Sequence, residues 1–437
     1  MLTRRETMAL GGLGLLAASG GALNPLTARE AMAQANARRG RPERDDPARA
    51  AMDEGFWSHV ARAFDIDRSI TNLNNGGVSP TVRYSLDALH RHLDASNHAP
   101  PYTMWKILEP RKETARQQLA EMFGCDSEEI AITRGASESL QTCQLGIDLR
   151  EGDEIVTTTQ DYPRMLTTFR QRQAREGITL KQFEIPVVAR GDDEIVSRFE
   201  AAITPSTRLV LMSHCVNISG QILPVRPVAE LCRARGVPMI VDGAHSFAQF
   251  HFTQEDLGCD YFGTSLHKWL FAPIGTGMLY VKKDRIGDLW PLMASNESQR
   301  NDIRKFEEIG THPAAQFLAI SEAITFNHTL GLARKNARFR YLRDRWARHL
   351  MQHERVRVHT DLDARFSGPI ATVQLEGIDS GQLSSWLFKS FRILVTPIQH
   401  EQFEGIRVSP SVYTTVQEID RFVEAMEHAL AHGIEDR

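Results

Sequence analysis

Short apolar segments alternate with amphipathic segments along this chain from about residue 51. The apolar segments have the length and composition of buried strands, and they are EIAIT (129–133), DEIVTTT (153–159), RLVLMSH (208–214), PMIVDGAH (238–245) and TGMLYVKK (276–283). Helical periodicity lies between them, for example over 110–123 and 225–235. Strands that alternate with helices predict a mainly parallel sheet covered on both faces, and such α/β sheets bind ligands at the carboxyl ends of their strands.

The pattern changes after residue 311, where helical periodicity prevails. It is followed by two further predicted strands, near 369–375 and 404–409. This part of the chain fits a smaller α+β domain. We therefore expect a large α/β domain with an N-terminal arm over 51–310 and a small domain over 311–437, which a chain of 437 residues can provide with separate cores.

The first 33 residues have the order of a bacterial export signal. Arg4 and Arg5 precede a short run rich in Gly, Ala and Leu, and Ala31-Met32-Ala33 resembles a cleavage site. The arginine pair predicts a twin-arginine leader, recognised by the twin-arginine export machinery, and a periplasmic or secreted protein. An ordinary Sec leader or a wrongly assigned start site is the alternative. The apolar run is too short and too rich in glycine for a stable membrane anchor. Residues 34–50 are charged, contain prolines and are predicted to be a linker.

Composition and charge point to a small-molecule partner. There are 51 basic and 55 acidic side chains, for a net charge of −4 without long blocks of one sign, so no nucleic-acid partner is indicated. The five cysteines lack disulfide or metal-ligand spacing and are interpreted as core residues, so no metal site is predicted.

Three of the strand ends carry candidate chemistry. Gly135-Ala136-Ser137 stands at a strand-to-helix turn and could bind a phosphate with backbone N–H groups, or could be an ordinary helix entry. Asp242 ends an apolar strand, as a cap or as the partner of a cation. Lys268 lies in the apolar stretch TSLHKWLFAP (264–273). It is either a snorkelling side chain or a desolvated amine able to form a Schiff base with a carbonyl.

A phosphate cup, a carboxylate and an apolar lysine at neighbouring strand ends are the three attachments that pyridoxal 5'-phosphate (PLP) requires. The order of these motifs resembles the class V aminotransferase-like enzymes of the fold-type I PLP-dependent superfamily over roughly residues 70–425. The isopenicillin N epimerase-like and cysteine desulfurase-like branches are the most similar.

The resemblance implies a role for each motif residue. It places the cofactor phosphate on Gly135, Ala136, Ser137, Ser265 and His267, the ring under Tyr162, Asn217 beside the phenolic oxygen, and His245 nearby. It assigns Lys268, Asp242 and Tyr162 to catalysis, and it assigns Arg407, Asn75 and Gly76 to substrate binding. Thr311 would reach the phosphate of a second subunit, which implies a homodimer, although His312 stands where the family has a proline. Tyr162 as a packed aromatic and Arg407 in a surface ion pair remain alternatives.

The type of reaction is less determined by the sequence. The segment before Arg407, RILVTPIQHEQFEGI, lacks the nucleophilic cysteine of cysteine desulfurases, so desulfuration is disfavoured. An isopenicillin N epimerase-like or aminotransferase-like enzyme acting on an amino acid is expected. The alternatives are a C–S lyase acting on a sulfur-substituted cysteine, and a non-catalytic secreted binding module that retains the fold.

Overall fold

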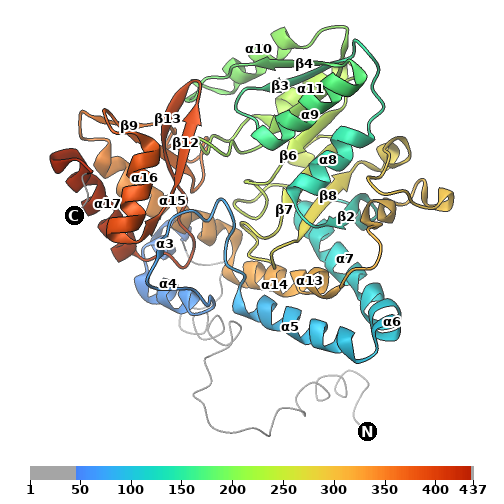
Figure 1. Ribbon diagram of the computed structural model, residues 1–437, viewed down its shortest axis with the longest axis horizontal. Helices are drawn as coiled ribbons and strands as arrows, with labels where there is room; N and C mark the ends of the chain where they lie inside the picture. The colour runs from blue at the N-terminus through green and yellow to red at the C-terminus, as the bar shows by residue number, and fades with distance from the viewer. Residues whose placement is uncertain (1–45, 435–437) are drawn as a thin grey trace, which may run out of the picture.

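The computed structural model describes residues 46–434. The predicted export signal and most of the predicted linker lie outside the described residues. The described chain forms a large part around a seven-stranded sheet and a smaller part around a four-stranded antiparallel sheet (Figure 1). The predicted large, mainly parallel α/β sheet and the smaller α+β part are therefore confirmed.

The large sheet has the strand order β2-β8-β7-β6-β5-β3-β4. β8 runs antiparallel to both of its neighbours, and the remaining pairs are parallel. The strands are β2 (Ile130–Thr133), β3 (Glu154–Thr158), β4 (Thr179–Phe183), β5 (Thr207–Ser213), β6 (Met239–Asp242), β7 (Tyr261–Ser265) and β8 (Gly277–Val281). The apolar pattern does not predict β4, because β4 is an edge strand in which no residue is fully buried.

Both faces of the large sheet are covered by helices. In β5, Leu209 and Leu211 belong to one core cluster, whereas Val210 and Met212 belong to another on the opposite face. Successive side chains of a strand point to opposite faces, so a strand buried on both sides needs such a continuous apolar run. The first cluster includes residues of α8 (Ala136–Gly146) and α9 (Pro163–Glu176), and the second includes residues of α7 (Lys112–Phe123), α10 (Asp192–Ala202) and α11 (Val225–Ala234).

The small sheet has the order β12-β13-β10-β9. Its strands are β9 (Val356–Val358), β10 (Ala371–Leu375), β12 (Thr396–His400) and β13 (Phe403–Val408), with α16 (Ser380–Phe391) and α17 (Val416–His432) packed on them. The sequence predicts only the two inner strands, β10 and β13, because the edge strands keep exposed positions. A separate pair joins β1 (Thr71–Asn72) to β11 (Ile393–Leu394).

One long helix contributes to both cores. In α15 (Leu332–Leu350), Phe339 packs in the large core, and Leu342 and Trp346 pack in the small one. The helix α3 (Pro47–Ala51) packs against α15 and begins inside the stretch predicted to be linker. The remaining α-helices are α4 (Glu54–Ala61), α5 (Arg83–His98), α6 (Pro100–Tyr102), α12 (Gln254–Leu257), α13 (Ala315–Leu318) and α14 (Ile320–Leu330). Within residues 46–434, no helix has the length and apolar character needed to cross a bilayer.

Candidate active site

The carboxyl ends of β3, β5, β6 and β7 meet at a cavity of about 260 Å³. The starts of α8 and α9 complete its wall. Most of the site residues predicted from the sequence line this cavity, and they are Ala136, Ser137, Tyr162, Asn217, Asp242, His245, Ser265, His267 and Lys268. Parallel strands bring their ends to one edge of a sheet, and this is why motifs more than 100 residues apart lie together here.

Lys268 points its amine into the cavity. Its Nζ lies 3.1 Å from Nε2 of His245, and the residues that follow it, Trp269 and Leu270, are buried. Burial lowers the pKa of Lys268 to about 8, the charge of Asp242 opposes this shift, and the charge of Arg407 adds to it. The amine therefore reaches its neutral, nucleophilic form far more easily than an ordinary lysine does, and it points into the cavity and not into bulk water.

Asp242 lies at the end of β6 on another wall of the cavity. Its Oδ1 accepts a hydrogen bond of 2.9 Å from the backbone N–H of Ala244. Burial raises the pKa of Asp242 to about 6, although that hydrogen bond and the charge of Lys268 act in the opposite direction. Asp242 therefore caps the following turn and also holds a carboxylate that a cationic group in the cavity would stabilise.

The start of α8 forms the end of the cavity at which the sequence predicts phosphate binding. The N–H of Ala136 donates to Oγ of Ser265 at 2.9 Å, and Nδ1 of His267 donates to the carbonyl of Thr276 at 3.1 Å. His267 therefore keeps Nε2 available. A Cβ on Gly277 would lie 2.4 Å from Cα of Gly135. The backbone at Gly135 therefore approaches β8 too closely for residue 277 to carry a side chain.

Arg407 comes from the small domain and reaches the same site. It sits on the inner strand β13 with 6% of its surface exposed. Its Nη1 donates to the carbonyl of Asn217 and its Nη2 to Oδ1 of Asn74, both at 3.0 Å. Burial lowers the pKa of Arg407 to about 10. A surface ion pair is therefore not its role.

The segment 72–77 runs alongside Arg407. The amide of Asn75 donates to the carbonyls of Asn72 and Ser409 and accepts from the hydroxyl of Tyr413, so it holds this segment in place. It is Asn74, not Asn75, whose side chain contacts Arg407. A Cβ on Gly76 would lie 3.6 Å from Cζ of Arg407, so this glycine lets the backbone approach the guanidinium. Substrate binding by Asn75 and Gly76 stays a prediction.

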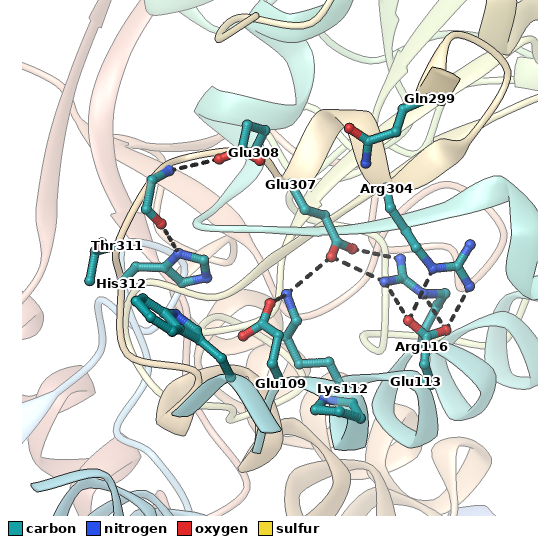
Figure 2. Close-up of a pocket in the computed structure, with 13 residues that line it drawn as sticks. Glu109, Lys112, Glu113, Arg116, Gln299, Arg304, Glu307, Glu308, Thr311 and His312 are labelled. Carbon is teal, nitrogen blue, oxygen red and sulfur yellow. Dashed lines mark hydrogen bonds and ion pairs between the residues drawn. The ribbon is translucent and has the colours of Figure 1, made fainter. Parts of the chain in front are cut away.

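Thr311 lies in a different place. Together with His312 it lines a second, charged pocket near Arg116 and Glu307 (Figure 2). In that pocket Arg116 is bonded to Glu307 and Glu113. Thr311 does not line the cavity of Lys268 in the same chain. The prediction that it reaches a second subunit's phosphate stays open.

Sequence reasoning missed Asp161, which directly precedes Tyr162. Its carboxylate is buried and joins the ends of β3 and β5 by accepting hydrogen bonds from the backbone N–H and hydroxyl groups of Ser213 and Thr158 and from the hydroxyl of Thr157. An acid at a strand end was the available signal. Tyr162 itself immediately precedes α9, lines the cavity and is 40% exposed, a position compatible with a ring that covers a bound ligand.

Cys215 was also missed, since the cysteines were all interpreted as core residues. Cys143, Cys232 and Cys259 are buried away from the cavity and Cys125 is half-buried. Cys215 is buried as well, but it lines the cavity. Burial raises its pKa to about 12, with Asp242 adding to the shift, so this side chain is a neutral thiol at physiological pH.

Unpartnered polar atoms at the cavity and at Arg407 show that the site suits PLP. Among residues 46–434, no partner is found for the buried Oδ1 of Asn217, Nδ1 of His245 and Nε of Arg407. Buried polar atoms are normally hydrogen-bonded, so these atoms are suited to a polar ligand. Within the same described part of the chain, no group of His, Cys, Asp and Glu side chains could hold a metal ion.

The chain belongs to the class-V aminotransferase family, whose model matches residues 76–422. Isopenicillin N epimerase of Streptomyces clavuligerus is 28% identical over 396 residues, which cover 85% of this chain and 98% of that protein. The enzyme of the same name from Amycolatopsis lactamdurans is 30% identical over 394 residues with the same coverage. Cysteine desulfurase IscS of Stutzerimonas stutzeri is 34% identical over 266 residues, or 60% of this chain and 62% of that protein.

Solved structures show the same fold. An apo cysteine desulfurase from Thermococcus onnurineus NA1 has a TM-score of 0.74 at 22% identity and covers 83% of this chain and 95% of its own. The cystine C–S lyase C-DES, in complex with cysteine persulfide, has a TM-score of 0.73 at 24% identity and covers 82% and 97%. Another C-DES structure contains PLP with a covalently linked glycine. The family and the cavity agree on PLP as the cofactor.

Proposed function

We propose that this protein is an enzyme that removes and returns the α-proton of an amino-acid substrate, as an isopenicillin N epimerase-like or aminotransferase-like enzyme. One observation carries the proposal. An amine that is easily neutralised, a buried carboxylate and a buried guanidinium come to a single site from the loop after β7, from the end of β6 and from β13. Bound PLP supplies an electron sink for negative charge at the substrate's α-carbon.

Asp242 and Lys268 divide the proton chemistry. Asp242 would hold a proton at the pyridine nitrogen, because a buried carboxylate favours a cationic neighbour. The amine of Lys268 would take up the α-proton of the substrate and return it. Burial, together with the charges of Lys268 and Arg407, lowers the pKa of His245 well below its ordinary value. The neutral ring can accept a hydrogen bond from Lys268 at 3.1 Å and so orient the amine.

Arg407 would bind the α-carboxylate. Its Nε–H has no partner among residues 46–434, and each Nη group bonds to one acceptor and keeps a second N–H. A planar guanidinium offers paired N–H groups that match the two oxygens of a carboxylate. Because Asn217 and Asn74 hold the guanidinium from two sides, the substrate meets a donor pair that is already oriented.

The segment before Arg407 argues against a desulfurase. β12 and β13 form a hairpin in which His400 pairs with Phe403, so Glu401 and Gln402 make a tight turn. Gln402 is bonded to Gln160 and to the carbonyl of Ile185. This turn contains no cysteine and is too short to carry a nucleophile into the cavity. Cys215, which does line the cavity, is a neutral thiol and not a thiolate.

The proposal is tested by incubating the purified enzyme with PLP and a panel of amino acids in heavy water, with and without a keto acid. Deuterium should enter the α-position of at least one amino acid. An epimerase will then yield the opposite enantiomer without the keto acid, and an aminotransferase will stop after one half-reaction until the keto acid is added. A β-lyase acting on a substituted cysteine will release pyruvate and ammonia. If PLP is bound but no amino acid exchanges its α-proton, the proposed substrate class is wrong.

We further propose that the protein acts as a homodimer in which Thr311 contacts the partner's cofactor phosphate. Thr311 faces a pocket away from the cavity of its own chain, and Trp105 in the same pocket is 54% exposed. Analytical ultracentrifugation should show a dimer, and Thr311→Ala should weaken PLP retention. A fully active monomer would contradict this proposal.

We also propose export by the twin-arginine route, on the evidence of Arg4, Arg5 and the weakly apolar run that follows them. Replacing both arginines with lysine should keep the protein inside the cell. Unchanged export would support a Sec route instead.

A further inference from the structure

The loop that carries Lys268 has an unusual pattern of hydrogen bonds. We define the Lys268 loop as residues 266–272, which form neither helix nor strand. Its backbone carbonyls are satisfied mainly from outside the loop. The donors are Ser79 N to His267 O, Lys335 Nζ to Trp269 O, Asn327 Nδ2 to Leu270 O, Val82 N to Phe271 O, and Thr81 Oγ1 to Ala272 O. The loop therefore takes its conformation from its neighbours.

The same loop contains a strained residue. Phe271 has a φ of 62°, in the left-handed region that bulky residues seldom occupy. Such a conformation costs on the order of 1–3 kcal/mol and persists only where the surroundings hold it. The ring of Phe271 is fully buried, and Nζ of Lys335 lies 4.2 Å from its centre. Three residues after the amine of Lys268, the chain is thus held in an unfavourable shape.

Lys335, on α15, contacts both the backbone of Trp269 and the ring of Phe271. Its side chain is completely buried and donates to the carbonyl of Trp269 and, at 2.6 Å, to Oδ1 of Asn327. Asn327, on α14, donates in turn to the carbonyl of Leu270 at 2.8 Å. Among residues 46–434, no ion pair to an acid is found for Lys335. Burial lowers its pKa well below the ordinary value, and its N–H groups donate in either protonation state.

A buried lysine without an acidic partner is expensive for stability. An apolar side chain of similar length would fill the same space at lower cost. One direct contact of the lysine to the backbone carbonyl of Trp269, and a second contact to Leu270 made through Asn327, give a reason for the lysine that packing alone does not supply. α15 also contributes Leu342 and Trp346 to the core of the small domain, which carries Arg407. The contact therefore ties the amine and the guanidinium of the site to one helix.

We propose that Lys335, together with Asn327, is a positioning residue that fixes the Lys268 loop and so sets where the amine of Lys268 stands in the cavity. The proposal rests on the role proposed above for Lys268. Lys335 touches neither cofactor nor substrate, and it does not line the cavity. Replacing Lys335 is therefore expected to change the pKa and the reactivity of the Lys268 amine, and not only the stability of the fold.

The test compares two buried lysines. Lys305 is 3% exposed and donates to the carbonyls of Ile286 at 2.5 Å and Arg300 at 2.8 Å, but it lies away from the cavity. Lys305→Met and Lys335→Met therefore remove the same kind of group in two places. The readouts on PLP-loaded protein are the pH midpoint of the visible absorbance that borohydride bleaches, the retention of PLP on dialysis, thermal stability and the α-proton exchange rate.

Lys335→Met should shift the absorbance midpoint by about one pH unit and slow exchange at least about tenfold, because a small displacement of a reacting group is costly. Lys305→Met should change thermal stability only. Asn327→Asp keeps an acceptor for Lys335 but loses the donor to Leu270, so it should shift the midpoint less and in the same direction. It is also the variant to use if Lys335→Met does not fold.

The proposal is overturned if Lys335→Met, or Asn327→Asp in its place, matches Lys305→Met in absorbance midpoint, PLP retention and exchange rate. The first two readouts need no substrate. They report on Lys268 even if the wild-type protein exchanges no α-proton, so failure of the proposed function and failure of this inference can be told apart.

Discussion

Replacing Asp242 with asparagine should stabilise the protein when PLP is absent. Burial raises the pKa of this carboxyl from 3.8 to about 6. A difference of about 2 pH units corresponds to about 3 kcal/mol at 1.36 kcal/mol per unit. Asparagine is neutral and can still accept the hydrogen bond from Ala244. The carboxylate of Asp242 therefore favours a cationic ligand in the site, but it lowers the free energy of unfolding of the protein without PLP.

The sign of the pH dependence follows from the raised pKa. At pH values well below 3.8 the carboxyl is protonated in both the folded and the unfolded state, so Asp242→Asn and wild type should be equally stable. As the pH rises through 3.8 and then 6, the wild type loses stability, because the unfolded chain ionises more easily. About half of the difference should be present at pH 5, and nearly all of the roughly 3 kcal/mol should be present at pH 8.

The assay is urea unfolding of the PLP-free proteins between pH 5 and 8. Asp161→Asn is the matched control, because Asp161 is equally buried but its carboxylate accepts five hydrogen bonds from Ser213, Thr157 and Thr158. Asparagine there turns an N–H group toward donors and should destabilise by about 1–3 kcal/mol. Adding PLP should stabilise the wild type more than Asp242→Asn. If Asp242→Asn lowers stability at pH 8, as the control does, the argument for Asp242 is wrong.

Three further outcomes are expected. Arg407→Ala should reduce kcat/KM for the amino-acid substrate about 10²–10³-fold, mainly through KM, because two charge-assisted hydrogen bonds are worth about 3–4 kcal/mol together. Arg407→Lys should recover part of the loss. An unchanged KM would contradict carboxylate binding by Arg407. Gly277→Ala should lower thermal stability and PLP affinity together, because its Cβ would lie 2.4 Å from Cα of Gly135 and relieving such a contact costs about 1–3 kcal/mol. If the variant keeps the PLP affinity of the wild type, the backbone at Gly135 can move away at little cost and the prediction is wrong. The rate at which PLP binds to the PLP-free protein should rise with pH along a curve with its midpoint near 8, since the neutral amine of Lys268 is the reactive form. Lys268→Ala should show no borohydride-sensitive absorbance. A rate independent of pH would contradict the lowered pKa of Lys268.

The fold class and the centre of the site were within reach of the sequence. Continuous apolar runs mark strands buried on both faces, as in β5 and β6, and the residues that follow such runs share one edge of the sheet. This is why Asp242 and Lys268 could be placed together from the chain alone. The edge strands β4, β9 and β12 carry weaker patterns, because each pairs on one side only and keeps exposed positions.

Only the tertiary structure decided how the site is held. Asn74 rather than Asn75 meets Arg407, Asp161 ties two strand ends together, and Lys335 supports the backbone beside Lys268. Each of these contacts depends on which distant segments meet and on which atoms lie within hydrogen-bonding distance. Periodicity along the chain reports which side chains are buried, because burial follows the local repeat of a helix or strand. It carries no information on the partner that a buried polar atom finds across the fold, and that partner determines what the atom does.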